Sequence, residues 1–202
     1  MAEFSVVILA GGTSSRMGKD KALLPFRGTT MIDHILCQVE GLGKETLIIA
    51  NDLEAYKHFA IPVYPDVVPG IGALGGLLSA LTVAAHPHVL VLACDMPFVN
   101  QSLYRHLMSL ITEYDAVMPR LNSGRREPFR SIYAKSCLEP VRAAINAGER
   151  KATSFLRFVR VRYVEEDEAK RYDPGLLTFF NINTPADLSE AEKIGAVASS
   201  KA

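Results

Sequence analysis

The sequence of 202 residues has few cysteines and no long uninterrupted apolar run. The three cysteines, Cys37, Cys94 and Cys137, are odd in number and far apart, so they favour neither a disulfide framework nor a zinc site. The first apolar run is about five residues long and follows no basic leader, which is too short for a signal peptide or a membrane-spanning helix. These absences predict a cytoplasmic protein that does not contact a membrane.

Net charge is also absent, because 22 lysines and arginines balance 22 aspartates and glutamates. A balanced chain has no bulk attraction for nucleic acid, and we expect no nucleic-acid partner. Hydrophobic residues make up 49% of the chain, which is typical of globular proteins. The length and the lack of repeats or linkers predict one domain over residues 1–196, with a flexible tail at 197–202.

The most informative stretch follows a predicted buried strand at residues 4–8. Residues 9–21 read Leu-Ala-Gly-Gly-Thr-Ser-Ser-Arg-Met-Gly-Lys-Asp-Lys and place three cations, Arg16, Lys19 and Lys21, among three glycines. Glycine lets a backbone approach a ligand closely, and successive free N–H groups bind anions. The spacing matches neither a Walker A loop nor G-x-G-x-x-G. A plain surface turn is the alternative. The position after a strand favours a phosphate-binding loop, because ligands of open α/β sheets bind beyond the carboxyl ends of strands.

Buried-strand patterns alternate with helical ones along the rest of the chain, which is typical of βαβ units. Further strands are predicted at residues 46–50, 61–64, 88–95, 116–121, 129–134, 160–164 and 176–182. Helices are predicted at residues 30–39, 53–59, 74–81, 100–114, 138–147 and 153–159, and from 184 onward. The segments at 116–121 and 129–134 are expected to pair as a hairpin. The predicted fold class is α/β, a single Rossmann-like domain with a mostly parallel mixed sheet flanked by helices.

Two carboxylates follow buried strands. Asp66 opens a glycine-rich loop, and Asp95 ends the strand at 88–95, where Pro97 stops the ladder. Mg²⁺ takes one or two carboxylates together with substrate phosphates, so Asp95 beside a phosphate-binding loop is a candidate metal ligand. The alternative is an aspartate that satisfies nearby backbone amides. Gly75 and Gly76 open the following helix, either because a ligand approaches there or because the helix packs tightly on the sheet.

The last predicted strand leads into a helix start formed by Thr184, Pro185 and Asp187. Asn181 and Asn183 are expected on one face of that strand, because side chains alternate with period two. Ordinary turn residues and a shared ligand or metal-shell site both remain open for this pair.

Taken together, these motifs resemble the nucleotidyltransferases of the molybdenum cofactor pathway and are most similar to the guanylyltransferase family. The matching elements, which run nearly the full length in the expected order, are Leu9-Ala10-Gly11-Gly12, Arg16-Met17-Gly18, Asp20-Lys21, Pro69-Gly70, Leu74-Gly75-Gly76, Cys94-Asp95-Met96-Pro97, Ala147-Gly148-Glu149-Arg150 and Asn181-Ile182-Asn183-Thr184-Pro185. There are two departures. The stretch from Arg16 to Lys21 is one residue shorter than in some relatives. Residues 125–128 (Arg-Arg-Glu-Pro) lack a His-Pro-Thr version found in some members.

The resemblance implies transfer of GMP from GTP to the terminal phosphate of molybdopterin, with release of pyrophosphate. It implies Mg²⁺ as the cofactor, held by Asp95, and transient contacts with cofactor-pathway proteins and molybdoenzymes. The residues it places at the nucleotide are Leu9, Ala10, Gly11, Gly12, Lys21, Asp66 and Asp95. Arg16 and Lys21 are the implied catalytic cations, and Asn181 and Asn183 the implied substrate-binding residues. The alternatives are a cytidylyltransferase of the same fold, acting on molybdopterin or another phosphorylated metabolite, and a non-catalytic nucleotide sensor.

Overall fold

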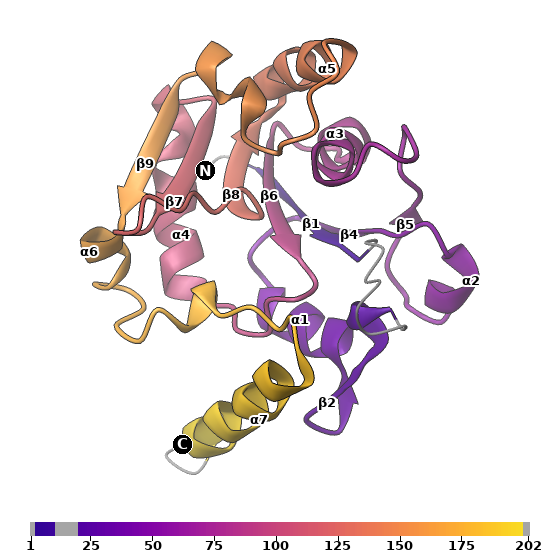
Figure 1. Ribbon diagram of the computed structural model, residues 1–202, viewed down its shortest axis with the longest axis vertical. Helices are drawn as coiled ribbons and strands as arrows, with labels where there is room; N and C mark the ends of the chain where they lie inside the picture. The colour runs from indigo at the N-terminus through magenta and orange to yellow at the C-terminus, as the bar shows by residue number, and fades with distance from the viewer. Residues whose placement is uncertain (1–2, 11–19, 200–202) are drawn as a thin grey trace.

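A seven-stranded sheet with helices on both faces forms the body of the molecule (Figure 1). The computed structural model describes residues 3–10 and 20–199. The strand order is β5-β4-β1-β6-β8-β7-β9. The strands of this sheet are β1 (Phe4–Leu9), β4 (Glu45–Ile49), β5 (Val63–Tyr64), β6 (His88–Ala93), β7 (Ala116–Arg120), β8 (Arg130–Ala134) and β9 (Val161–Glu165). In this sheet β8 runs antiparallel to both of its neighbours and the other strands run parallel to one another. The predicted mostly parallel mixed sheet is confirmed.

Alternation along the strands builds a separate apolar core on each face of the sheet. In β1, Val6 and Ile8 enter one core, whereas Val7 enters the other. Helices α1 (Met31–Val39) and α4 (Gln101–Ser109) supply the first core, and α3 (Ala73–Val83) and α5 (Leu138–Asn146) supply the second. The sheet is therefore buried on both sides, as expected for parallel strands joined by helical crossovers.

The remaining helices and the small hairpin lie around this body. They are α2 (Leu53–Tyr56), α6 (Glu166–Ala169), α7 (Pro185–Ser199) and the two-stranded β2 (Pro25–Phe26) and β3 (Thr29–Thr30). Short 3₁₀ turns are η1 (Lys21–Leu23), η2 (Ile111–Glu113), η3 (Lys135–Cys137), η4 (Ser154–Phe158) and η5 (Leu177–Phe179). Helix α7 includes residues 197–199 of the segment expected to be a tail. No helix in the described part of the chain is both long and apolar enough to span a bilayer.

The predicted helix starts are confirmed by their hydrogen bonds. Thr30 and Asp33 form a capping box at α1, with Asp33 N donating to Thr30 Oγ1 (3.2 Å). Asn100 Oδ1 accepts from Leu103 N (3.0 Å) at the start of α4. Thr184 N donates to the Asp187 carboxylate (2.8 Å) at the start of α7. Local sequence is sufficient at these sites because each cap satisfies backbone groups within one turn.

Several predicted elements differ in the structure, and α2 ends at Tyr56 instead of residue 59. Residues 176–182 do not form a strand: they contain η5 followed by extended chain. Residues 153–159 form the 3₁₀ turn η4 in place of an α-helix, and α4 ends at Ser109 with η2 beyond it. Residues 176–182 form no strand because their backbone groups bond outside the sheet. Side chains donate to three of the carbonyls, and Ile182 N donates to the carbonyl of Asp95.

Candidate active site

The carboxyl ends of four parallel strands meet at one edge of the sheet. Leu9 at the end of β1 is aligned with Ile49 on β4 and with Ala93 on β6, and Ile49 is aligned with Tyr64 on β5. The backbone then continues the ladder briefly, because Ala10 N donates to Ile49 O (2.8 Å) and Cys94 N donates to Leu9 O (3.1 Å). Ala10 and Cys94, which follow two of these strands, are thereby placed side by side at the edge where open α/β sheets bind ligands.

Lys21 brings the segment after β1 to the end of β6. Its Nζ lies 4.0 Å from Asp95 Oδ2 and donates to Ile182 O (3.0 Å) and to Asn183 Oδ1 (3.1 Å). The turn that carries Lys21 is fixed by Asp20, whose carboxylate accepts from Ala22 N (3.0 Å) and from the Tyr56 hydroxyl (2.6 Å). Residues predicted from three separate motifs thus lie in one cluster.

Asp95 is a largely buried carboxylate with one oxygen unsatisfied. Its Oδ1 is buried and has no hydrogen-bond partner among the described residues, whereas Oδ2 faces Lys21. Burial raises the pKa of the Asp95 carboxyl, and the positive charges of Lys21 and Arg130 offset that rise in part. An orphaned carboxylate oxygen at the edge where open α/β sheets bind ligands fits a divalent cation, which accepts oxygen ligands from protein and substrate together. The described residues hold no cluster of three or more His, Cys, Asp or Glu side chains suited to a metal. Asp95 is therefore a single candidate ligand at this point and, among the described residues, not part of a preformed cluster of protein ligands.

Asp66 is held rigidly at the neighbouring strand end. Its Oδ2 accepts from Asn51 Nδ2 (2.9 Å), and its backbone N–H donates back to Asn51 Oδ1 (3.0 Å). On the other side, the Ser79 hydroxyl lies 3.1 Å from Asp66 Oδ1 and accepts from Val67 N (2.9 Å). Each carboxylate oxygen keeps a second lone pair, so Asp66 remains able to accept hydrogen bonds from a ligand.

Asn181 and Asn183 lie on the extended chain after η5, each bonded to a different cation. Asn181 Oδ1 accepts from Arg130 Nη2 (2.6 Å), whereas Asn183 Oδ1 accepts from Lys21. Arg130 is fully buried at the start of β8 and forms an ion pair with the buried Glu127. The two asparagines are therefore held by two different cations, and they lie on extended chain because the strand expected at 176–182 does not form.

Two polar residues of this region, Asn51 and Arg130, escaped the sequence analysis. Asn51 directly follows the strand at 46–50, and the strand-end argument used for Asp66 and Asp95 applies to it equally. Arg130 is a charge within an otherwise apolar segment, which signals a buried partner, but only the fold identifies that partner as Glu127. Nothing in the sequence links Arg130 or Glu127 to Asn181.

The glycines that open α3 are explained by packing. A Cβ on Gly75 would lie 2.8 Å from the Cβ of Ile71, and a Cβ on Gly76 would lie 3.3 Å from Leu9 Cδ1. Tight packing of the helix against the sheet, one of the two alternatives, is thus supported at Gly76, whereas Gly75 packs against Ile71 of the preceding loop. Leu9 and Ala10 lie at the end of β1 as expected. The remaining predicted loop residues, Gly11, Gly12 and Arg16, lie outside the described residues.

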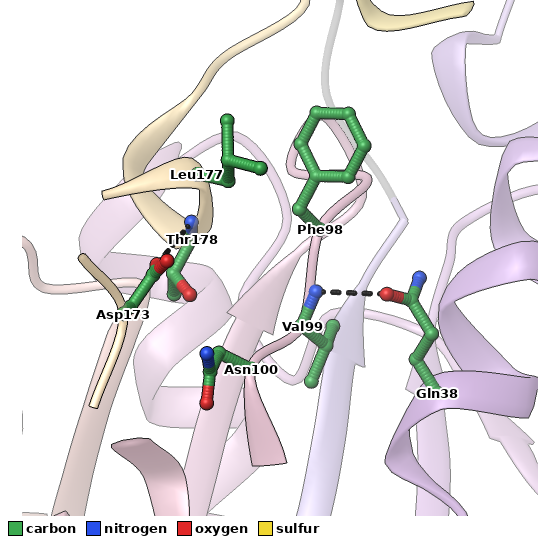
Figure 2. A pocket seen from close by; sticks show the side chains of 7 residues that line it. All are labelled: Gln38, Phe98, Val99, Asn100, Asp173, Leu177 and Thr178. Atoms are coloured by element: carbon green, nitrogen blue, oxygen red, sulfur yellow. Dashed lines mark hydrogen bonds between the residues drawn. The ribbon is translucent and has the colours of Figure 1, made fainter. Parts of the chain in front are cut away.

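A small pocket of about 170 Å³ lies between the loop after β6 and the segment that contains η5 (Figure 2). Its lining residues are Gln38, Phe98, Val99, Asn100, Asp173, Leu177 and Thr178. Val99 N donates to Gln38 Oε1 (3.0 Å), and Thr178 N donates to Asp173 Oδ2 (2.8 Å). Phe98 also packs edge-on against Phe180, with 6.0 Å between ring centroids. The pocket contains none of the predicted site residues.

Comparisons with known proteins agree with this geometry. A protein of Pelotomaculum thermopropionicum called "Probable molybdenum cofactor guanylyltransferase" is 36% identical over 191 residues, covering 95% of this chain and 93% of its own. A crystal structure of "Molybdopterin-guanine dinucleotide biosynthesis protein A" from Archaeoglobus fulgidus superimposes with a TM-score of 0.83 at 29% identity, covering 95% and 98% of the two chains. The 2-C-methyl-D-erythritol 4-phosphate cytidylyltransferase of Thermus thermophilus, at 19% identity and a TM-score of 0.70, covers 94% and 98% and shares the fold.

The fold, together with relatives that match nearly the full chain, defines a nucleotidyltransferase of the Rossmann-like α/β class. The profile of the family described as "MobA-like NTP transferase domain" matches residues 6–167. The chain belongs to this family, and the predicted family resemblance is confirmed.

Proposed function

We propose that this chain transfers GMP from GTP to the terminal phosphate of molybdopterin and releases pyrophosphate. The observation that carries the proposal is the cluster in which Lys21 Nζ contacts Asp95, Ile182 O and Asn183 at the carboxyl edge of the sheet. The names of relatives that match nearly the full chain support the choice of substrates.

The reaction is a displacement at the α-phosphorus of GTP. A phosphate oxygen of the acceptor attacks, and pyrophosphate leaves in line. The attacking oxygen is already anionic near neutral pH, so the site needs no strong general base. Lys21 neutralises charge on the triphosphate, with Arg16 as the second proposed cation. Positioning and charge neutralisation supply most of the barrier reduction in such phosphoryl transfers.

The proposed cofactor is Mg²⁺. Asp95, through its unpartnered Oδ1, is the residue that would hold the cation, together with phosphate oxygens of the substrate. When bound, the ion supplies charge neutralisation at the triphosphate and assists departure of pyrophosphate. Asp95 itself accepts the ion as a carboxylate whose other oxygen is oriented by Lys21.

Asp66 is the proposed contact to the guanine base. Guanine presents two adjacent N–H donors, and a carboxylate fixed by Asn51 and Ser79 offers acceptors at a defined position. Cytosine has a different donor and acceptor pattern. The cytidylyltransferase alternative uses the same site residues with CTP bound in place of GTP.

The test compares pyrophosphate release from GTP and from CTP, each with molybdopterin and Mg²⁺. The proposal expects release from GTP and at least about 10-fold less from CTP, because a bidentate hydrogen-bond contact to one base discriminates against another by about 1–3 kcal/mol. Faster release from CTP would establish the cytidylyltransferase, and tight GTP binding with no release would establish the sensor. If the finished cofactor passes to molybdoenzymes, transient protein contacts in the cytoplasm follow from the same proposal.

A further inference from the structure

Two arginines hold the chain that crosses in front of the sheet edge. Arg125 Nη2 donates to Phe179 O (3.4 Å), and Arg130 Nη2 donates to Phe180 O (3.1 Å) as well as to Asn181. Arg125 lies on the connection that leads into β8, and Arg130 is the first residue of β8. Both arginines pair with Glu127. Arg125 Nε lies 2.6 Å from Glu127 Oε1, and Arg130 Nη1 contacts Glu127 Oε2.

Both members of the Glu127–Arg130 pair are buried. Arg130 is 0% exposed and Glu127 is 5% exposed. The Arg130 guanidinium also stands over the ring of Phe179, with 5.7 Å between Cζ and the ring centroid. A buried charge is tolerated only when it is paired, and the planar guanidinium fork fixes the direction of each of its hydrogen bonds.

The partner of Asn181 determines which end of its amide is free. A guanidinium has N–H donors and no acceptor, so Asn181 must turn its oxygen toward Arg130. Its NH₂ group is then the end that is left to bind a ligand, and no described residue accepts from it. Lys21 imposes the same orientation on Asn183, because an ammonium group also has donors alone.

We infer that Arg130 is a positioning residue, held by Glu127, which locks the Asn181 amide so that its NH₂ group faces the acceptor substrate. Asn181 and Asn183 together then present N–H donors, and the chemical group they fit is an anion or a carbonyl rich in acceptor oxygens, such as the acceptor's phosphate. This inference rests on the proposed function for the identity of the acceptor, and on the described contacts for the role of Arg130.

Asn181→Asp tests the orientation of the amide. The variant keeps an oxygen for Arg130, so the fold retains that contact, but it replaces the outward NH₂ with a second oxygen that repels an anion. We expect the KM for molybdopterin to rise by at least about 10-fold, while the KM for GTP stays within about 2-fold. An unchanged KM for molybdopterin would overturn the assigned orientation.

A double-mutant cycle tests whether Arg130 acts through Asn181. Replacing Glu127 and Arg130 together by methionine leaves no uncompensated buried charge, so the protein is expected to fold. The Glu139→Met/Arg142→Met variant, which removes an exposed ion pair of the same spacing on α5, is the matched control. We expect the Glu127→Met/Arg130→Met variant to raise the KM for molybdopterin about 5-fold, and Asn181→Ala to add nothing further in that background. Additive effects would overturn the inference.

A measurement without substrate separates this inference from the proposed function. In ¹⁵N NMR, the side-chain amide of Asn181, assigned by its loss in Asn181→Ala, should have an order parameter near 0.85 in the wild type and below about 0.6 in Glu127→Met/Arg130→Met. A wild-type protein that releases no pyrophosphate from GTP and molybdopterin refutes the proposed function alone. An order parameter that is equal in both proteins refutes the positioning role of Arg130.

Discussion

Lys21 and Asp95 hold the same residue, Ile182, from two sides. Lys21 Nζ donates to the carbonyl of Ile182 (3.0 Å), and the carbonyl of Asp95 accepts from its N–H (2.9 Å). The side chains of Lys21 and Asp95 are themselves 4.0 Å apart. The segment around Ile182 therefore fixes the spacing between a cation and a carboxylate that come from two different strand ends.

Loss of the Lys21 ammonium is expected to lower kcat/KM by about 10²-fold or more, the scale for one preorganised charge stabiliser. Lys21→Ala is assayed by pyrophosphate release from GTP and molybdopterin. Lys57→Ala is the matched control, because Lys57 pairs with Glu54 on the exposed surface. Near-normal turnover of Lys21→Ala would exclude Lys21 from the mechanism.

Asp95→Asn is expected to weaken the response to Mg²⁺ and turnover together, because an amide oxygen carries no charge to hold the cation. The measurement is a titration of initial rate against Mg²⁺ concentration, and the midpoint should move upward by about 10-fold or more. A titration curve that coincides with that of the wild type would reject Asp95 as the ligand.

Asp95→Asn is also expected to change the stability of the protein. Burial raises the pKa of Asp95, so the folded protein binds this proton more readily than the unfolded chain. The ionised carboxylate therefore lowers the free energy of unfolding at neutral pH. This loss of stability disappears as the pH falls through the pKa of Asp95 in the folded protein toward its pKa in the unfolded chain, about 3.9. Thermal unfolding with EDTA should show Asp95→Asn with a higher Tm than the wild type at pH 7. The difference in Tm between the two proteins should become smaller in acid. A lower Tm for Asp95→Asn than for the wild type at pH 7 would contradict the conclusion that burial is the main influence on the pKa of Asp95.

Asn51→Ala is expected to raise the KM for GTP by about 2- to 10-fold, because the Asp66 carboxylate loses one of its two fixed supports. The value of kcat at saturating GTP should change little. Asn122→Ala, which removes an exposed amide bonded to Glu166 away from Asp66, is the control. A KM for GTP equal to the wild-type value would show that Asp66 needs no support from Asn51.

Glu127→Ala is expected to destabilise the protein by about 3–5 kcal/mol, because it leaves the fully buried Arg130 without its counterion. Arg142→Ala breaks an exposed pair and should cost less than about 1 kcal/mol. Urea unfolding at pH 7 measures both variants. Equal losses would mean that the Glu127–Arg130 pair is no more important than a surface contact.

Much of the fold was predictable because its signals are local. The capping pairs at Thr30 and Thr184 bond within one turn, and the strands are apolar because both faces of the sheet are covered. The segment at 176–182 misled the analysis for the opposite reason. Its apolar residues are typical of a strand, but Arg125, Arg130 and Lys21 take its carbonyls. Pattern alone does not reveal such distant donors.

The sequence alone determined the α/β class and the strand-end positions of Asp66 and Asp95, because these follow from periodicity, and its motifs carried the family resemblance that the comparisons confirm. Only the tertiary structure decided which polar groups meet. Glu127, Arg130 and Asn181 come from three separate segments, and their hydrogen bonds depend on how β8 is inserted antiparallel beside β6. A buried ion pair requires that its partners be brought together by the packed core, and no spacing along the chain encodes that contact.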